Sequence, residues 1–109
     1  MEQIFNKLVR DNIPYIIESN NEVAVTRTLN DDEFRIELYK KLKEECNEVI
    51  GAKDTTQIME ELADVLEVLK SIAQLENKSI DDIISIADEK KLKRGGFEKK
   101  IFLEKTYKK

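Results

Sequence analysis

Residues 43–64, KEECNEVIGAKDTTQIMEELAD, decide the fold, because they hold the end of one predicted helix, a short loop and the start of another. Four acids in this stretch form two pairs with the same spacing, Glu45 with Glu48 and Glu61 with Asp64. Residues three apart lie on one face of a helix, so each pair can present both carboxylates on one side. Because the loop is short, the helices are expected to be antiparallel neighbours that bring the two pairs together.

Two of the four acids lie on the apolar side of their helix. At about 100° per residue, Glu45 falls inside the apolar stripe of the first helix and Glu61 inside that of the second. Glu48 and Asp64 lie at the stripe edges. The first stripe comprises Phe34, Leu38, Leu42, Cys46 and Val49, and the second comprises Ile58, Leu62, Val65, Leu66, Val68, Leu69 and Ile72. A carboxylate that faces a core is costly unless it is paired or metal-bound, so we expect a cation between the helices.

Two other interpretations of the acids stay open at this point. Acids at this spacing are common on solvated helix faces, and a chain with 23 Asp and Glu residues forms some such pairs by chance. That interpretation does not explain acids on the apolar side. The second alternative is a buried ion pair with Lys41 or Lys93.

The metal chemistry is narrowed by the absence of histidine. An all-carboxylate site suits hard cations, with Mg²⁺ expected and Mn²⁺ possible, and disfavours zinc and di-iron centres. Such a site indicates metal-assisted hydrolysis of a phosphate ester or anhydride. A carboxylate of the cluster, or the neighbouring Glu44, would accept the proton.

Composition indicates a single domain over residues 1–109, built mainly from helices with charged outer faces. The net charge of −4 argues against a nucleic-acid partner. No apolar run is long enough to span a membrane and no signal peptide is recognisable, so a cytoplasmic location is expected. The single cysteine, Cys46, excludes an internal disulfide, and its place in the apolar stripe predicts a buried thiol.

Four helices and two strands are predicted along the chain. The helices cover about residues 12–19, 31–50, 56–76 and 79–94, and their starts are marked by Pro14 and by the cap residues Asn30, Asp54 and Ser79. The alternating segments 22–29 and 101–107 predict a small two-stranded ribbon. The fold class is therefore mainly α, an antiparallel helical bundle with a small β ribbon.

Several segments resemble the all-α nucleoside triphosphate pyrophosphatases, the superfamily of MazG and phosphoribosyl-ATP pyrophosphohydrolase. Residues 44–48 and 61–64 match its EExxE and ExxD metal signature. The segments NKLVRDNIP (residues 6–14), ELADVLEV (61–68) and RGGFE (94–98) are similar to a stand-alone subgroup described as phosphoribosyl-ATP pyrophosphohydrolase-like.

The resemblance implies hydrolysis of a nucleoside triphosphate to the monophosphate and pyrophosphate, with Mg²⁺ bound by Glu45, Glu48, Glu61 and Asp64. It implies a bundle completed by a homodimer or homotetramer. Glu44 matches the first acid of the signature, but its phase points away from the other acids and indicates a supporting role. The alternatives are the phosphoribosyl-ATP step of histidine biosynthesis and a non-catalytic nucleotide-binding module.

Basic residues of the subgroup-like segments are expected to reach the triphosphate. They are Lys7, Arg10, Lys93 and Arg94. Lys93 and Arg94 have an alternative role at the C-terminal end of a helix, where positive charge is favourable. Arg10 can instead pair with the adjacent Asp11.

Overall fold

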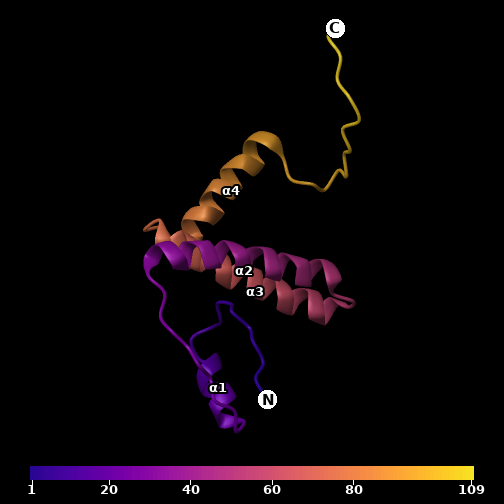
Figure 1. The fold of residues 1–109 in the computed structure, drawn as a ribbon. Helices are drawn as coiled ribbons and strands as arrows, with labels where there is room; N and C mark the ends of the chain where they lie inside the picture. The colour runs from indigo at the N-terminus through magenta and orange to yellow at the C-terminus, as the bar shows by residue number, and fades with distance from the viewer.

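The computed structural model describes residues 1–109 and contains four helices and no strand (Figure 1). They are α1 (Ile13–Ser19), α2 (Asp31–Gly51), α3 (Thr55–Leu75) and α4 (Ile80–Arg94). All four predicted helices are confirmed, with ends within one residue of the predicted ones. The molecule is elongated, with principal extents of 66 × 35 × 25 Å.

Helix caps explain why these boundaries are readable in the sequence. Asn30 and Ser79 each form a capping box with the acid three residues later, Glu33 and Asp82. The Asp54 side chain accepts a hydrogen bond from the Gln57 N–H at 2.8 Å and so starts α3. Each long helix therefore begins where a side chain satisfies its first free N–H groups.

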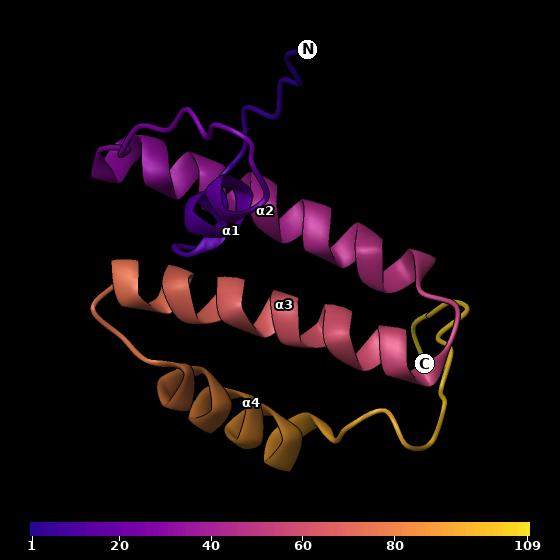
Figure 2. The same cartoon turned by 90° about the horizontal axis from the view of Figure 1, so that it is seen from below.

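The centre of the fold is the antiparallel pair of α2 and α3, which Figure 2 shows side by side. Leu38 of α2 and Val68 and Ala73 of α3 are the buried hydrophobic residues, between 3% and 7% exposed. Helix α4 packs on α3 over a short length, and α1 makes no close contact with another helix. The α2–α3 seam therefore holds the small core of this chain.

The predicted β ribbon is wrong, since neither residues 22–29 nor residues 101–107 form a strand. The first segment links α1 to α2, whereas the second runs outward beyond the far end of α4 (Figure 1). A strand needs a neighbour to satisfy its backbone groups. In the first segment, the Ala24 N–H donates instead to the Glu18 side chain at 3.3 Å.

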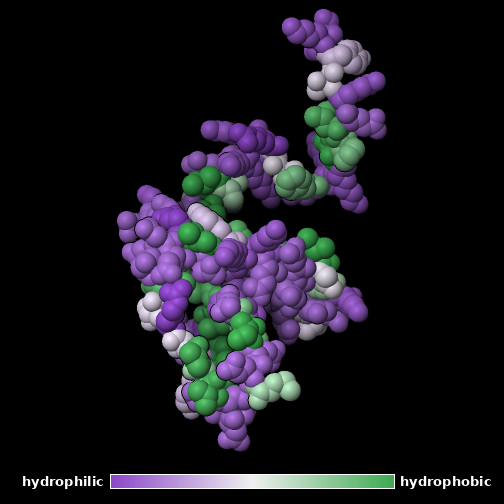
Figure 3. Space-filling view, viewed as in Figure 1, coloured by the Kyte–Doolittle hydropathy of each residue, from purple (hydrophilic) through white to green (hydrophobic).

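Many hydrophobic side chains remain at the surface (Figure 3). On α3 they include Met59, Leu62 and Leu66, and the segment after α4 exposes Phe97, Ile101, Phe102, Leu103 and Tyr107. Cys46 is also exposed, so the predicted burial of its thiol is wrong. The first stripe is wider than the strip of α2 that α3 covers, and Cys46 lies on the uncovered part.

Candidate metal centre

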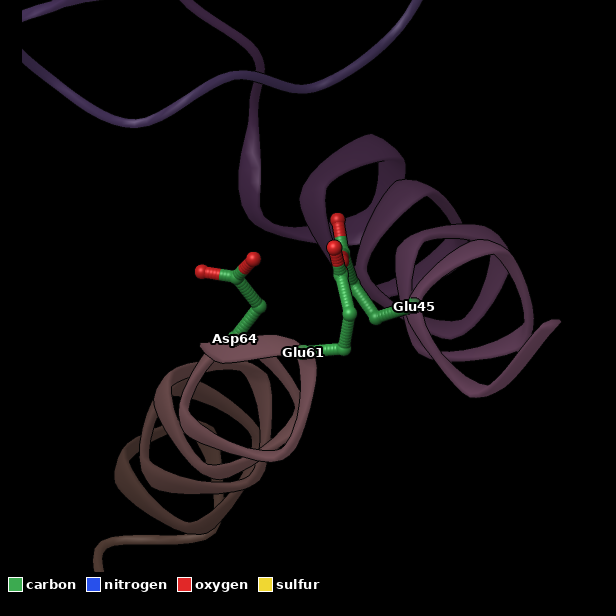
Figure 4. A group of neighbouring side chains, drawn as sticks. All are labelled: Glu45, Glu61 and Asp64. Carbon is green, nitrogen blue, oxygen red and sulfur yellow. The ribbon is translucent and has the colours of Figure 1, made fainter. Parts of the chain in front are cut away.

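The α2–α3 hairpin brings three of the four predicted acids together. One carboxylate oxygen from each of Glu45, Glu61 and Asp64 lies within 4.8 Å of the others. Figure 4 shows the carboxyl groups of Glu45 and Glu61 side by side, with Asp64 next to them on α3. We call these three residues the carboxylate cluster.

The tight loop sets the register that makes this cluster. Glu45 lies six residues before Gly51, the last residue of α2, and Glu61 lies six residues after Thr55, the first residue of α3. At 1.5 Å per residue, both are about 9 Å from the loop end of their helices. The two side chains therefore meet across the seam.

Glu45 is the buried member of the cluster, with 8% of the residue exposed. Its nearest cation is Lys41, whose Nζ lies 3.4 Å from Glu45 Oε1 and 3.4 Å from Glu44 Oε2. The ion pair with Lys41 considered from the sequence is therefore present. It coexists with the carboxylate cluster and does not replace it.

Glu48 is exposed and lies at the rim, outside the closely grouped oxygens. Its negative charge nonetheless affects the carboxyl group of Glu61 in the cluster. Partial burial raises the pKa of the Glu61 carboxyl above its ordinary value, and the negative charges of Glu48, Asp64 and Glu45 raise that pKa further. Mutual repulsion of this kind is relieved by a cation.

Glu44 is not one of the three grouped acids and lies between two lysines. Lys41 approaches one of its oxygens at 3.4 Å, and Lys7 Nζ donates to the other at 3.3 Å. Both oxygens are thus engaged by positive charge. The supporting role of Glu44 stays a prediction.

Arg10 reaches the cluster directly, because its Nη2 donates to Asp64 Oδ1 at 2.7 Å. The predicted alternative, a pair with Asp11, is not formed. Arg10 and Lys7 were predicted to bind phosphate, and the contacts that they make here are with acids at and beside the cluster. Sequence patterns do not reveal a pair of exposed groups 54 residues apart.

Lys93 and Arg94 are not brought to the acids. They lie in the last turn of α4, which leads away from the α2–α3 pair in Figure 1, and neither forms an ion pair with the cluster. Their position fits the alternative interpretation, in which positive charge complements the C-terminal end of a helix.

The donor set fits a hard divalent cation. Three carboxylate oxygens from two rigid helices are the ligand type that Mg²⁺ and Mn²⁺ prefer. Around one Mg²⁺, neighbouring ligand oxygens lie about 3 Å apart and opposite ones about 4.2 Å apart. The three oxygens lie within 4.8 Å of one another, so side-chain rotation would have to draw them closer to hold such an ion.

The fold and the site together define an all-helical protein with a carboxylate centre between two antiparallel helices. The model of the MazG nucleotide pyrophosphohydrolase domain matches residues 35–95, more than half of the chain, including Glu44 and all four paired acids. The chain belongs to the MazG nucleotide pyrophosphohydrolase family. The description of this family names nucleotide pyrophosphohydrolase activity.

Comparisons with individual proteins and with solved structures say less about this chain than the family model does. An uncharacterized protein of Mycolicibacterium smegmatis is 46% identical over 46 residues, which are 42% of this chain and 47% of that protein. The match thus spans about half the length of that relative. No solved structure matches the chain. None of the four helices combines the length and the apolar character needed to cross a membrane.

Proposed function

We propose that the protein hydrolyses a nucleoside triphosphate to the monophosphate and pyrophosphate, using Mg²⁺ or Mn²⁺. The observation that carries the proposal is the close grouping of Glu45, Glu61 and Asp64 inside the region that matches the family model. These three residues would hold the cation, and Glu48 would stay at the rim as an unbound carboxylate. The bound cation would supply positive charge to the phosphate oxygens and acidify a bound water.

The chain's own residues would position the substrate and take up the proton. Water would add to phosphorus, the bond between the α and β phosphates would break, and a carboxylate would accept the proton. Glu48 is exposed and has no ion-pair partner, whereas Glu44 is engaged by Lys7 and Lys41. Of these two acids, Glu48 is therefore the better proton acceptor.

A homodimer or homotetramer is part of the proposal. Only three hydrophobic residues of this chain are buried, while Leu62 and Leu66 of α3 are 43% and 42% exposed and Ile86 of α4 is 55% exposed. Covering these side chains in a larger bundle would add apolar burial that one chain lacks. Light scattering coupled to gel filtration measures the assembly, and a monomer at micromolar concentration would contradict this part. A cytoplasmic location stays a prediction.

A screen of nucleoside triphosphates and phosphoribosyl-ATP for pyrophosphate release, with Mg²⁺ or Mn²⁺, tests the activity. We expect turnover of at least one nucleoside triphosphate by the unaltered protein and its loss in Glu61→Gln. Glu67→Gln is the matched control, because Glu67 is an exposed glutamate of α3 outside the cluster. Unchanged turnover in Glu61→Gln would remove Glu61 from the site. Binding without turnover would support a nucleotide-binding module instead.

A further inference from the structure

The N-terminal segment before α1 touches the acids at two points, although it lies outside the residues that match the family model. Arg10 donates to Asp64 and Lys7 donates to Glu44. Leu8 and Val9, between these two cations, are half-buried. The two charged contacts therefore hold the segment beside the acids.

The contact of Arg10 is with a residue of the cluster itself. Arg10 Nη2 lies 2.7 Å from the same carboxyl group that Asp64 would offer to a divalent cation. A guanidinium and a divalent cation at this group repel each other and compete for its oxygens. Cation binding at the cluster and the Arg10–Asp64 pair therefore oppose one another.

The competition favours the divalent cation. The Arg10 and Asp64 side chains are 57% and 40% exposed, and ion pairs this exposed to water are weak. A divalent cation gains the charges of all three carboxylates and relieves the repulsion among them. Asp64 is thus expected to exchange Arg10 for the cation.

We propose that Arg10 has two alternative partners, Asp64 in the cation-free protein and the triphosphate of the substrate once a divalent cation occupies the cluster. The inference rests on the proposed function. The released guanidinium stays at the rim of the cluster, within reach of phosphate oxygens that share the cation. Its planar set of donors matches two phosphate oxygens at once. Arg10 thereby makes triphosphate binding follow cation binding.

Two alternative partners give Arg10→Gln two effects of opposite sign. Removal of the competing guanidinium should tighten cation binding by about 1.5- to 5-fold, the range expected from loss of an exposed ion pair. Removal of the phosphate ligand should weaken triphosphate binding by about tenfold or more, because hydrogen bonds to charged groups are strong. A residue that only stabilised the fold would not produce this crossed pattern.

Arg27 supplies a matched control. It forms an ion pair with Glu33 at 3.1 Å, with side chains 69% and 42% exposed, and lies away from the cluster. Arg27→Gln removes the same side chain from a comparable exposed pair. Both affinities should stay at the values of the unaltered protein.

The experiment measures two affinities for the unaltered protein, Arg10→Gln and Arg27→Gln. Calorimetry with Mn²⁺ alone gives the first, and calorimetry with a preformed complex of Mn²⁺ and inorganic tripolyphosphate gives the second. Tripolyphosphate carries the phosphate chain without a base, so an unsuitable base cannot cause a negative result. Tighter Mn²⁺ binding together with weaker tripolyphosphate binding in Arg10→Gln supports the proposal.

Other outcomes overturn it. Equal affinities in Arg10→Gln and Arg27→Gln, with Mn²⁺ binding and nucleotide turnover intact, would refute the exchange and leave the proposed function standing. Tighter Mn²⁺ binding without a change for tripolyphosphate would show that Arg10 only competes with the cation. If the unaltered protein binds no Mn²⁺, the proposed function and the exchange both fail.

Discussion

Substitutions of Lys41 and Glu45 test whether the buried carboxylate of Glu45 serves an ion pair or a metal centre. Lys41 Nζ lies 3.4 Å from a carboxylate oxygen of Glu45 and 3.4 Å from one of Glu44. If Glu45 serves only an ion pair, losing either partner should destabilise the fold alike. If Glu45 belongs to a metal centre, Glu45→Gln and Lys41→Met should differ.

The magnitudes follow from these contacts. At 3.4 Å and an effective dielectric constant of about 20, each attraction of Lys41 is about 5 kcal/mol before the cost of desolvation. Lys41→Met leaves Glu45 buried without its cation, and breaking a buried pair costs about 3–5 kcal/mol. We expect about 3 kcal/mol, because side-chain rotation can bring Glu45 some water. Glu45→Gln should cost less than about 1 kcal/mol, because Lys41 keeps Glu44 and one repelling charge leaves the cluster.

Urea unfolding followed by circular dichroism, at one protein concentration and with chelator present, measures these free energies. Calorimetry with Mg²⁺ should show affinity at least about tenfold lower in Glu45→Gln, which is about 1.4 kcal/mol. Lys41→Met should bind Mg²⁺ more tightly than the unaltered protein, since a competing charge is gone. Equal destabilisation by the two changes, with Mg²⁺ affinity unchanged in Glu45→Gln, would refute the metal role of Glu45.

Three further predictions concern the fold, each read by unfolding or circular dichroism. Asn30→Ala removes the cap of α2 and should lower the free energy of unfolding by about 1 kcal/mol; an unchanged value would mean that the cap bond adds nothing. Leu38 is 3% exposed, and Leu38→Ala should lower the free energy of unfolding by at least about 2 kcal/mol. Ile50 is 82% exposed, and Ile50→Ala should lower it far less. Hydrogen bonds from Ser79 lower the pKa of Asp82 in the folded protein. The stability that Asp82 contributes is therefore fully present above the ordinary aspartate pKa of about 3.9. It is lost as the pH falls through the lower pKa of the folded state. In Asp82→Asn, the helix signal in circular dichroism should fall less as the pH is lowered. An unchanged dependence on pH would contradict the contribution of Asp82 to stability.

Local signals carried most of what the sequence predicted. Pro14 located α1, and capping residues with apolar periodicity located the three longer helices, because these signals lie within a few residues and need no knowledge of the fold. The phase of Glu45 predicted its burial, because α3 covers that side of α2.

Errors arose where the outcome depended on distant parts of the chain. Cys46 lies in the apolar stripe but on a side of α2 that no other helix covers. The ribbon required residues 22–29 and 101–107 to meet, and they leave the bundle in different directions (Figure 1). Arg10 and Asp64 are 54 positions apart in the chain, and no sequence pattern around either residue predicts the other as its partner.

The α2–α3 seam carries a buried charge in a chain that has little core to support one. Four residues are buried in all, and Glu45 is one of them. Replacing a buried ion pair by hydrophobic residues of similar volume is often neutral or stabilising, so packing alone gives no reason for a carboxylate at this position. The side chains that set the spacing between α2 and α3 also set the distance from Glu45 to Glu61 and Asp64. A divalent cation would supply both the missing countercharge and a link between the helices, which gives the buried carboxylate a physical reason that packing does not.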